Sequence, residues 1–469
     1  MRRAWLGSAV AILSVAQAQS DDTRLVAAMQ SRDVATVRTL LAEGVGVNTT
    51  DAETATALHW AAHWNDTEAV RLLLDAGADP NARNRFDVTP LHEAALQLNS
   101  EMVQALLEAG ADPNAAFGDG ETVVMTAART GHAGVLGLLL EHGGDISAAE
   151  GWHGQTALMW AAQENHADAA RLLIEHGASV NRRSTAHDWV EIEYSAGNVP
   201  KTRDVGGLTP LHFAARHGST EVAAVLLAAG ADLTATEPMY ELTPLQTAIV
   251  NGHYTLAMRL IEQGADVDDG SLYLAVDTRN LGYYAQRPNP PQKDGEFTSL
   301  DVIVALLKQG ADAELAYEKG IPERTVAGQI EAPRGAIPLD RAAVATDAAA
   351  IRALVEYGAD PNATAADGAT ALLLLSGLSR GRAVTALDES PERLEAIQTL
   401  LNAGANPDIQ EPKTGNTAFH YAAGLKAREV ASMLNRYGAN GNIRNAEGQS
   451  VWDLMDGSDF ISGASPDTR

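Results

Sequence analysis

Thirteen histidines and 61 carboxylates are the residues of this chain that could do acid–base or metal chemistry. Histidine titrates near neutral pH and is a common metal ligand, so a cluster of histidines would indicate a general base or a metal site. The sequence has no phosphate-binding glycine loop, no His-Glu-x-x-His and no dinucleotide-binding glycine turn to accompany them. Carboxylates spread this evenly are more typical of solvated helix surfaces than of a catalytic pair. We therefore predict a protein that is not an enzyme, with no catalytic residues, no metal site and no cofactor.

The chain of 469 residues is strongly acidic, with a formal net charge of -27 at pH 7. Affinity for phosphates comes mainly from Lys and Arg, so this charge argues against a nucleic-acid partner and against anionic membranes. It is compatible with a basic protein partner, and equally with the charge that keeps a long repetitive protein soluble. The chain has no cysteine, which excludes disulfides, cysteine zinc sites and thiolate nucleophiles.

Residues 1–18 have the pattern of a cleavable export signal. Arg2 and Arg3 precede an apolar stretch, and Ala16-Gln17-Ala18 supplies the small residues that a signal peptidase requires. No later segment has the roughly 18 uninterrupted apolar residues of a transmembrane helix. We therefore expect an exported protein, periplasmic or secreted, whose mature chain begins at Gln19 and does not insert into a membrane.

The elements that position these residues come from a repeat of 33 or 34 residues. The motif Gly-Ala-Asp-Pro-Asn begins at Gly77, Gly110 and Gly358, and degenerate copies bring the total to eleven. The other copies begin at Gly44, Gly143, Gly177, Gly230, Gly264, Gly310, Gly404 and Gly438. A period this regular indicates stacked units that bury their apolar faces against each other.

A second motif precedes each glycine, as in Thr89-Pro90-Leu91-His92 and its copies at Thr209, Thr56, Thr243 and Thr417. Threonine caps a helix and proline suits its first position, so this motif predicts a short inner helix. The apolar run after Asn99 predicts an outer helix that ends at Gly110, where glycine tolerates a left-handed cap.

With both motifs, the sequence resembles the ankyrin repeat family over nearly the whole mature chain. The resemblance implies an all-α solenoid of helix-turn-helix-finger units, about eleven repeats with terminal caps. We expect an exported bacterial member of the family. The segments are a signal peptide (1–18), an N-terminal capping repeat (19–48), repeats (49–181), an inserted finger (182–206), repeats (207–442), a C-terminal cap (443–456) and a disordered tail (457–469).

Long intervals between the glycines indicate insertions near 280–298, 315–335 and 377–391, in addition to the finger at 182–206. The insertions near 280–298 and 377–391 fall between the two helices of a unit, and the other two fall in fingers. In the first inserted finger, Trp189 and Tyr194 alternate with acidic residues, as in a hairpin with one aromatic face. These rings either anchor a partner or cover the core of the finger itself.

The resemblance also implies a role for the recurring histidines and for the partner-binding wall. His59, His92, His212 and His420 occupy one place in successive units, where an imidazole ties a helix to the next finger. In the family the finger tips and inner helices form a concave wall that binds proteins. The positions that map to its variable slots are Trp64, Arg85, Phe86, Arg129, Trp152, His153, Glu164, His217 and Tyr240.

We therefore expect a monomeric protein-binding scaffold whose partner is another protein. Tryptophan, tyrosine and arginine often dominate binding energy, which favours Trp64, Trp152 and Tyr240, with Trp189 and Tyr194 as alternatives in the inserted finger. Two other functions stay open at this stage. One is an accessory subunit or inhibitor of an exported enzyme, and the other is an enzyme or small-ligand receptor that uses an inserted loop.

Overall fold

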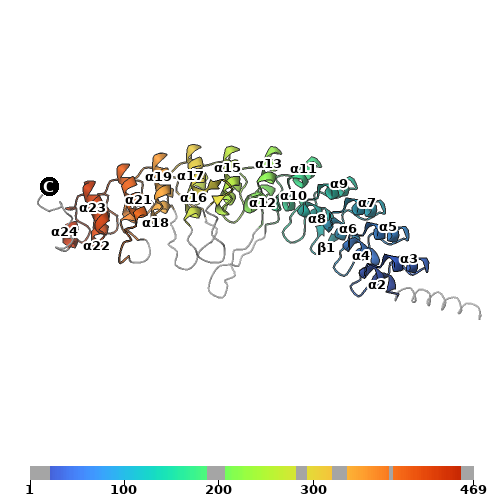
Figure 1. Ribbon diagram of the computed structural model, residues 1–469. Helices are drawn as coiled ribbons and strands as arrows, with labels where there is room; N and C mark the ends of the chain where they lie inside the picture. The colour runs from blue at the N-terminus through green and yellow to red at the C-terminus, as the bar shows by residue number, and fades with distance from the viewer. Residues whose placement is uncertain (1–21, 187–205, 281–292, 320–334, 380–383, 456–469) are drawn as a thin grey trace, which may run out of the picture. The chain divides into compact units, whose positions relative to one another are not determined.

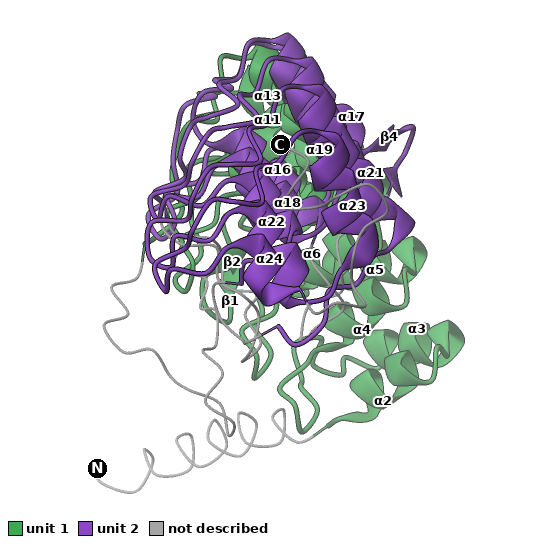
Figure 2. Cartoon of the chain, turned by 90° about the vertical axis from the view of Figure 1, so that its left-hand side faces the viewer, with its two compact units in different colours: residues 1–187, 206–232 green, residues 188–205, 233–469 purple. Residues whose placement is uncertain are grey.

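The computed structural model describes residues 22–186, 206–280, 293–319, 335–379 and 384–455. The predicted signal peptide, the tail at 457–469 and most of the inserted finger, including Trp189 and Tyr194, lie outside the described residues. The chain divides into two compact units, unit 1 (1–187 and 206–232) and unit 2 (188–205 and 233–469) (Figure 2). Each unit is a stack of antiparallel helix pairs (Figure 1).

Unit 1 contains six helix pairs and one short hairpin among its described residues. Its elements are α2 (Arg24–Gln30), α3 (Val34–Ala42), α4 (Ala57–His63), α5 (Thr67–Asp75), α6 (Pro90–Leu96), α7 (Ser100–Glu108), β1 (Ala116–Phe117), β2 (Glu121–Thr122), α8 (Val123–Thr130), α9 (Ala133–Glu141), α10 (Ala157–Gln163), α11 (Ala167–Glu175), α12 (Pro210–His217) and α13 (Thr220–Ala228). The inner helices α2, α4, α6, α8, α10 and α12 contact one another in sequence order, and so do the outer helices from α5 to α13. The predicted solenoid is confirmed for this unit.

Unit 2 repeats this arrangement. Its elements are α14 (Pro244–Val250), α15 (Tyr254–Glu262), α16 (Ser271–Arg279), β3 (Lys293–Asp294), β4 (Phe297–Thr298), α17 (Ser299–Lys308), α18 (Pro338–Val344), α19 (Ala348–Glu356), α20 (Ala371–Leu375), α21 (Pro391–Asn402), α22 (Ala418–Gly424), α23 (Arg428–Arg436) and α24 (Val451–Leu454). The even-numbered helices from α14 to α24 form the inner row, and in the described part of this unit the connecting loops gather on one side of the stack (Figure 2). The short helix α24 begins a further repeat, as the sequence predicts.

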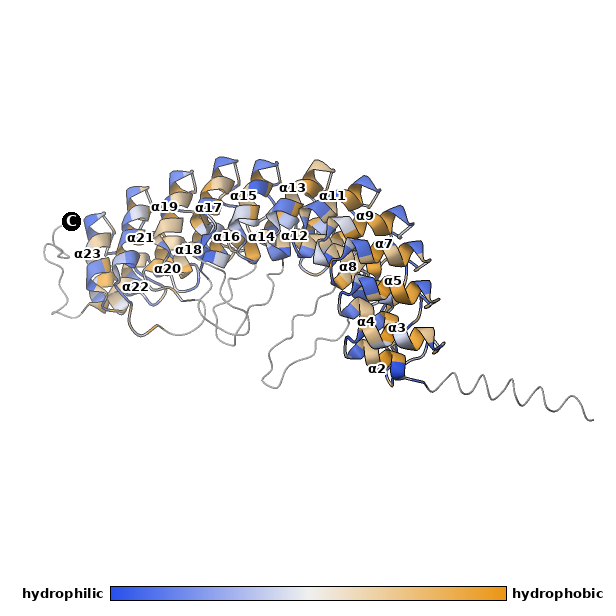
Figure 3. Cartoon of the chain, turned by 45° about the vertical axis from the view of Figure 1, so that its right-hand side comes forward, coloured by the Kyte–Doolittle hydropathy of each residue, from blue (hydrophilic) through white to orange (hydrophobic). Residues whose placement is uncertain are grey.

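The core of each unit consists of small and aliphatic side chains along the helix contacts. In one typical pair, Leu91 and Ala94 of α6 and Leu106 of α7 are completely buried. Hydrophobic and hydrophilic residues alternate along most of the helices, so these helices have an apolar face for their neighbours, whereas α20 is apolar and buried throughout (Figure 3). The scarcity of aromatic residues follows, because thin helix pairs leave little room for large rings.

Glycine ends each outer helix for a conformational reason. Gly77 has φ +86, and its N–H and that of Ala78 donate to Leu74 and Leu73, which closes the last turn of α5. A Cβ at Gly77 would meet nothing within 4 Å, so the requirement comes from the left-handed backbone and not from crowding.

Asparagine side chains join successive repeats just beyond these glycines. Asn81 donates from Nδ2 to the carbonyl of Gly110 (2.8 Å) and accepts from the N–H of Asp112 (2.7 Å). Asn48, Asn114 and Asn181 of unit 1, and Asn362 of unit 2, make the same pair of bonds to the next repeat. In unit 2, Asp268 and Asp408 take this place and make only the accepting bond.

The recurring histidines cap the inner helices, and His59 and His420 also reach the next finger as the resemblance implies, whereas Nε2 of His92 is buried without a hydrogen-bond partner. Nδ1 of His59 accepts from the N–H of Thr56 (3.1 Å), and its Nε2 lies 3.0 Å from the carbonyl of Val88 in the next finger. This geometry requires a neutral imidazole with the proton on Nε2, because a protonated Nδ1 cannot accept from Thr56. His420 makes the equivalent contacts to Thr417 and Gln449.

Two parts of unit 2 depart from the regular repeat. The repeat that begins at Gly264 has no finger, because α16 starts at Ser271 directly after Gly270, and the rings of Tyr273 and Tyr317 stack at 5.0 Å beside it. The described end of the insertion between α16 and α17 forms the hairpin β3–β4, in which Asp294 accepts from the N–H of Thr255 (2.9 Å) at the start of α15.

The buried imidazoles make the stability of the fold depend on pH. Burial, with a further contribution from the Arg83 guanidinium, lowers the pKa of His92 to about 4. An unfolded histidine has a pKa of about 6.5, so between these values the unfolded chain binds a proton that the native chain excludes. The stabilisation from His92 is thus complete above the unfolded pKa and is lost as the pH falls towards about 4.

We predict that lowering the pH from about 7 to about 5 decreases the free energy of unfolding by about 2 kcal/mol through His92 alone. Urea denaturation at both pH values measures this decrease. The variant His92→Gln should reduce it, because Gln246 already fills the same place in this chain, accepting from Thr243 and donating to the carbonyl of Asp269. An unchanged pH dependence in His92→Gln would contradict the prediction.

Candidate protein-binding surface

Several fingers between repeats are each folded by one polar side chain. Oδ1 of Asn84 accepts from the N–H groups of Phe86 (2.9 Å) and Val88 (3.1 Å), and Asp51 accepts in the same way in the preceding finger. These bonds close the turn from inside. The side chain of Phe86 at the tip is therefore left to face solvent.

Three fingers use glutamate in place of asparagine or aspartate. Glu150 is 8% exposed and accepts from the N–H groups of Trp152 (2.7 Å), His153 (2.7 Å) and Gln155 (2.9 Å). The longer side chain spans a loop with one more residue, and Glu237 and Glu411 do the same. Sequence reasoning missed these residues, although the 34-residue spacing of their repeats, against 33 for those of Asp51 and Asn84, was the signal.

Phe86 forms an exposed aromatic tip on a braced finger. Its side chain is 57% exposed. The Arg85 guanidinium lies 4.6 Å from the centre of the Phe86 ring and also pairs with Glu53 of the preceding finger. The N–H of Arg85 donates to the carbonyl of Glu53 (3.0 Å), so side chain and backbone both hold this tip in place.

Trp152 forms a second exposed tip two fingers further along unit 1. It is also 57% exposed, and the ring of His153 lies edge-on to it at 6.0 Å. The finger is held on both sides, since the N–H of Gly151 donates to Asp119 (2.5 Å) and the carbonyl of His153 accepts from Thr185 (2.7 Å). The hairpin β1–β2, with its glycine-rich turn, lies in the finger between the two tips.

Trp64 differs from the expectation that it is an exposed anchor. Trp64 is half-buried. Arg32 of the first repeat covers the face of its ring, with the guanidinium 4.1 Å from the ring centre. Trp60 and His63 pack against the same indole at 6.0 Å and 4.8 Å. Trp64 is therefore a packing residue of the first two repeats.

The remaining predicted residues lie at the ends of inner helices or in unit 2. Arg129 forms an ion pair with Glu121 (3.3 Å) near the ring of Trp160. Glu164 and His217 are exposed at the ends of α10 and α12. Tyr240 is half-buried in the Glu237 finger of unit 2, where the neighbouring Met239 is 43% exposed. In unit 1, Arg85 and Phe86 thus lie on one finger and Trp152 and His153 on another, with the β1–β2 finger between them.

Family comparisons agree with this architecture. A model of ankyrin repeats in three copies matches residues 25–117, 91–184 and 190–278, and a model of many copies matches residues 382–434. Together these matches cover more than half of the chain. The chain belongs to the ankyrin repeat family. Ankyrin repeats are generally scaffolds for protein–protein interaction and generally not enzymes.

Ankyrin proteins from distant organisms resemble parts of the chain. The ankyrin repeat protein nuc-2 of Neurospora crassa is 30% identical over 192 residues, which is 37% of this chain and 17% of the relative. A putative ankyrin repeat protein of Rickettsia felis is 32% identical over 134 residues, 28% of this chain and 55% of the relative. The crystal structure of the human ASB11 ankyrin repeat domain is 25% identical, covers 52% of this chain and 98% of that chain, and has a TM-score of 0.42. The chain thus spans less than two thirds of the curated relatives' lengths.

The described part of this ankyrin chain contains neither a side-chain cluster that could bind a metal nor a membrane-spanning helix. No three His, Asp or Glu side chains in it converge on a point where a metal could bind, and none of its helices is long and apolar enough to cross a membrane. The pattern Gly-x-Ser-x-Gly occurs at 377–381, directly after α20. A nucleophile elbow follows a strand, so Ser379 lacks the context that its motif requires.

The different burial of the tryptophans leads to a stability prediction. Trp152→Ala and Phe86→Ala should change the free energy of unfolding by less than about 0.5 kcal/mol, because both rings already face solvent. Trp64→Ala should lower it by roughly 1–2 kcal/mol, because the ring loses its packing against Arg32, Trp60 and His63. Urea denaturation of the three variants measures these changes. Equal losses for Trp64 and Trp152 would contradict the assignment of Trp64 to packing.

Proposed function

We propose that this protein is a monomeric, exported bacterial scaffold that binds a partner protein through the fingers of unit 1. The observation that supports the proposal most directly is the pair of tips formed by Phe86 and Trp152. Most large apolar side chains in the described residues are buried, whereas these two rings are 57% exposed on fingers that are rigidly hydrogen-bonded. A rigid exposed aromatic ring loses little conformational entropy on binding and is typical of energetic hot spots.

The spacing of the tips indicates the size of the partner's contact. Adjacent helices pack about 8–10 Å apart, so two repeats separate the tips by roughly 16–20 Å. A contact that reaches both rings therefore extends over three fingers, and the turn of β1–β2 between the tips is bonded through the carbonyl of Asp119 to the N–H of Gly151 beside Trp152. Arg85 and His153 add polar contacts beside each ring.

We predict that the double variant Phe86→Ala/Trp152→Ala loses the partner while remaining folded. The mature chain, immobilised as bait in an extract of the native envelope, should retain a protein that the double variant retains at least tenfold less. Tyr357→Ala provides the matched control, because it removes another exposed aromatic ring, 39% exposed, at the end of the outer helix α19. Quantitative mass spectrometry compares the three baits.

A protein retained equally by all three baits would contradict the finger site. If the protein that depends on the tips is an enzyme whose activity changes when the chain is added, the chain acts as its accessory subunit or inhibitor. A partner that instead requires residues 182–206 would place the binding site in the inserted finger with Trp189 and Tyr194.

Export is the second part of the proposal and rests on the pattern of residues 1–18. We predict that the protein isolated from its native host begins at Gln19, because Ala16-Gln17-Ala18 precedes it as a cleavage site. N-terminal sequencing measures this directly, and fractionation of the cells gives the compartment. A cytosolic protein that retains Met1 would refute export and leave the binding proposal intact.

A further inference from the structure

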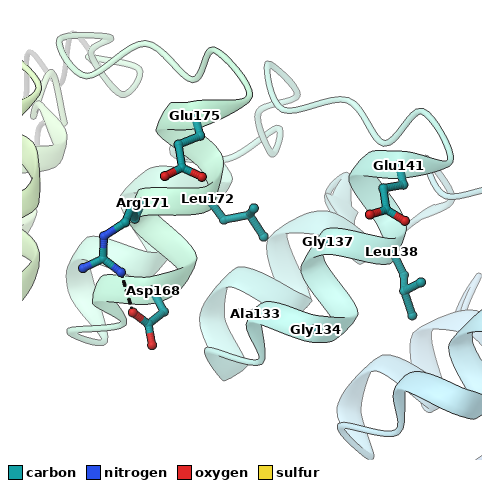
Figure 4. Close-up of a pocket in the computed structure, with 9 residues that line it drawn as sticks. All are labelled: Ala133, Gly134, Gly137, Leu138, Glu141, Asp168, Arg171, Leu172 and Glu175. Carbon is teal, nitrogen blue, oxygen red and sulfur yellow. Dashed lines mark hydrogen bonds and ion pairs between the residues drawn. The ribbon is translucent and has the colours of Figure 1, made fainter.

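A groove crosses the opposite side of unit 1, between the outer helices α9 and α11. It has a volume of about 470 Å³ and is lined by one face of each helix. Gly134 and Gly137 leave the backbone of α9 bare, and Leu172 reaches from α11 towards Gly137 (Figure 4). The carboxylates of Glu141 and Glu175 stand at the same end of the two helices (Figure 4).

The groove lies where a row of ion pairs between successive outer helices is interrupted. In the preceding repeats, the fifth residue of one outer helix pairs with the second residue of the next, as Arg38 does with Glu68 and Arg71 with Glu101. In α9 both of these positions are glycine, at Gly134 and Gly137. No ion pair of the described residues therefore joins α9 to α11 at this position, where the apolar side chain of Leu172 reaches towards Gly137 instead.

Packing explains only one of the two glycines. A Cβ at Gly134 would lie 3.0 Å from Oγ of Ser100, a tight contact. A Cβ at Gly137 would lie 3.8 Å from Leu172, an ordinary van der Waals distance, so a larger residue fits there. Glycine inside a helix costs about 1 kcal/mol relative to alanine. Glycine at position 137 thus lowers the stability of α9, although the packing around it does not require glycine.

Two carboxylates at this end of the groove have no side-chain partner. In α7, Gln104 donates to Glu108 one turn later (2.8 Å), but Gly137 cannot do this for Glu141. In α11, Arg171 bonds to Asp168 (2.6 Å) and not to Glu175. The side-chain carboxylates of Glu141 and Glu175 form no hydrogen bond or ion pair with any residue that the structure describes. The groove is therefore apolar at its centre and negatively charged at one end.

The geometry points to a second docking site in this groove, which takes a basic amphipathic helix of a partner protein. Helices pack about 8–10 Å apart, so Glu141 and Glu175 are separated by about that distance. Two cationic residues separated by two turns of a helix lie about 10 Å apart on one face, and a side chain one turn from each lies between them. A helix with Lys or Arg at both positions and a leucine between them would pair both carboxylates and place the leucine over the apolar groove between α9 and α11.

A labelled alanine-based helical peptide with this pattern, two lysines two turns apart and a leucine midway on the same face, tests the site. Its binding to the full chain is measured by fluorescence anisotropy at low and high salt. We expect the double variant Glu141→Gln/Glu175→Gln to bind it at least tenfold more weakly at low salt. We also expect the salt dependence to fall, because the two ion pairs are lost.

The variant Gly137→Gln fills the groove and should weaken binding at least tenfold. It copies Gln104 of α7, so it can donate to Glu141 and favours the helix. Ala224→Gln is the matched control, because it places the same side chain at the same exposed position of α13 and should bind the peptide like the unaltered chain. Phe86→Ala/Trp152→Ala should also bind normally, which separates this site from the finger surface.

Two results would overturn the proposal. The first is that the peptide fails to bind the unaltered chain, or that it binds the Gly137→Gln variant equally well. The other is self-association of the unaltered chain in sedimentation that Gly137→Gln abolishes without any peptide binding. In that case the groove is a contact between copies of this chain.

Discussion

Each helix pair of this chain buries its apolar faces only against the pairs before and after it, because a pair of helices this short cannot enclose a core of its own. The rest of the structure follows from this constraint. Every repeat must present the same face in the same register, so a few residues that fix the register recur: the threonine that caps the inner helix, the imidazole beside it and the glycine that ends the outer helix. The finger tips and the solvent-facing surfaces of the outer helices do not set this register, so their amino-acid sequence can vary.

The residues under this constraint were predictable from the sequence. Thr56, His59 and Gly77 cap and end helices through local geometry, and local geometry leaves a regular pattern in the chain. The C-terminal cap at Val451 was predictable for the same reason, since Ser450 caps its helix as threonine caps most of the inner helices. The bridging role of His59 needed the resemblance as well, because its acceptor, Val88, lies in another repeat.

What could not be predicted depends on contacts between positions that are far apart in the sequence. Trp64 occupies a variable slot and suggested an anchor, but Arg32 from the preceding repeat covers it. The finger before α16 is missing. In its place the ring of Tyr317, which lies more than a full repeat later in the sequence, stacks on Tyr273. Phe86 and Trp152 were placed correctly at the finger tips, whereas the buried Glu150 that shapes one of those tips was not recognised.

The asparagine bridges give the interfaces of unit 2 unequal mechanical strength. Asn362 joins its repeat to the next by two bonds, one donated to Gly404 and one accepted from Asn406. Asp268 and Asp408 have no amide proton to donate, so each holds the next repeat by a single bond. Under a pulling force along the stack, this link would resist through two bonds at Asn362 and through one bond at Asp268 and at Asp408, a difference that comes from one amide group in place of a carboxylate.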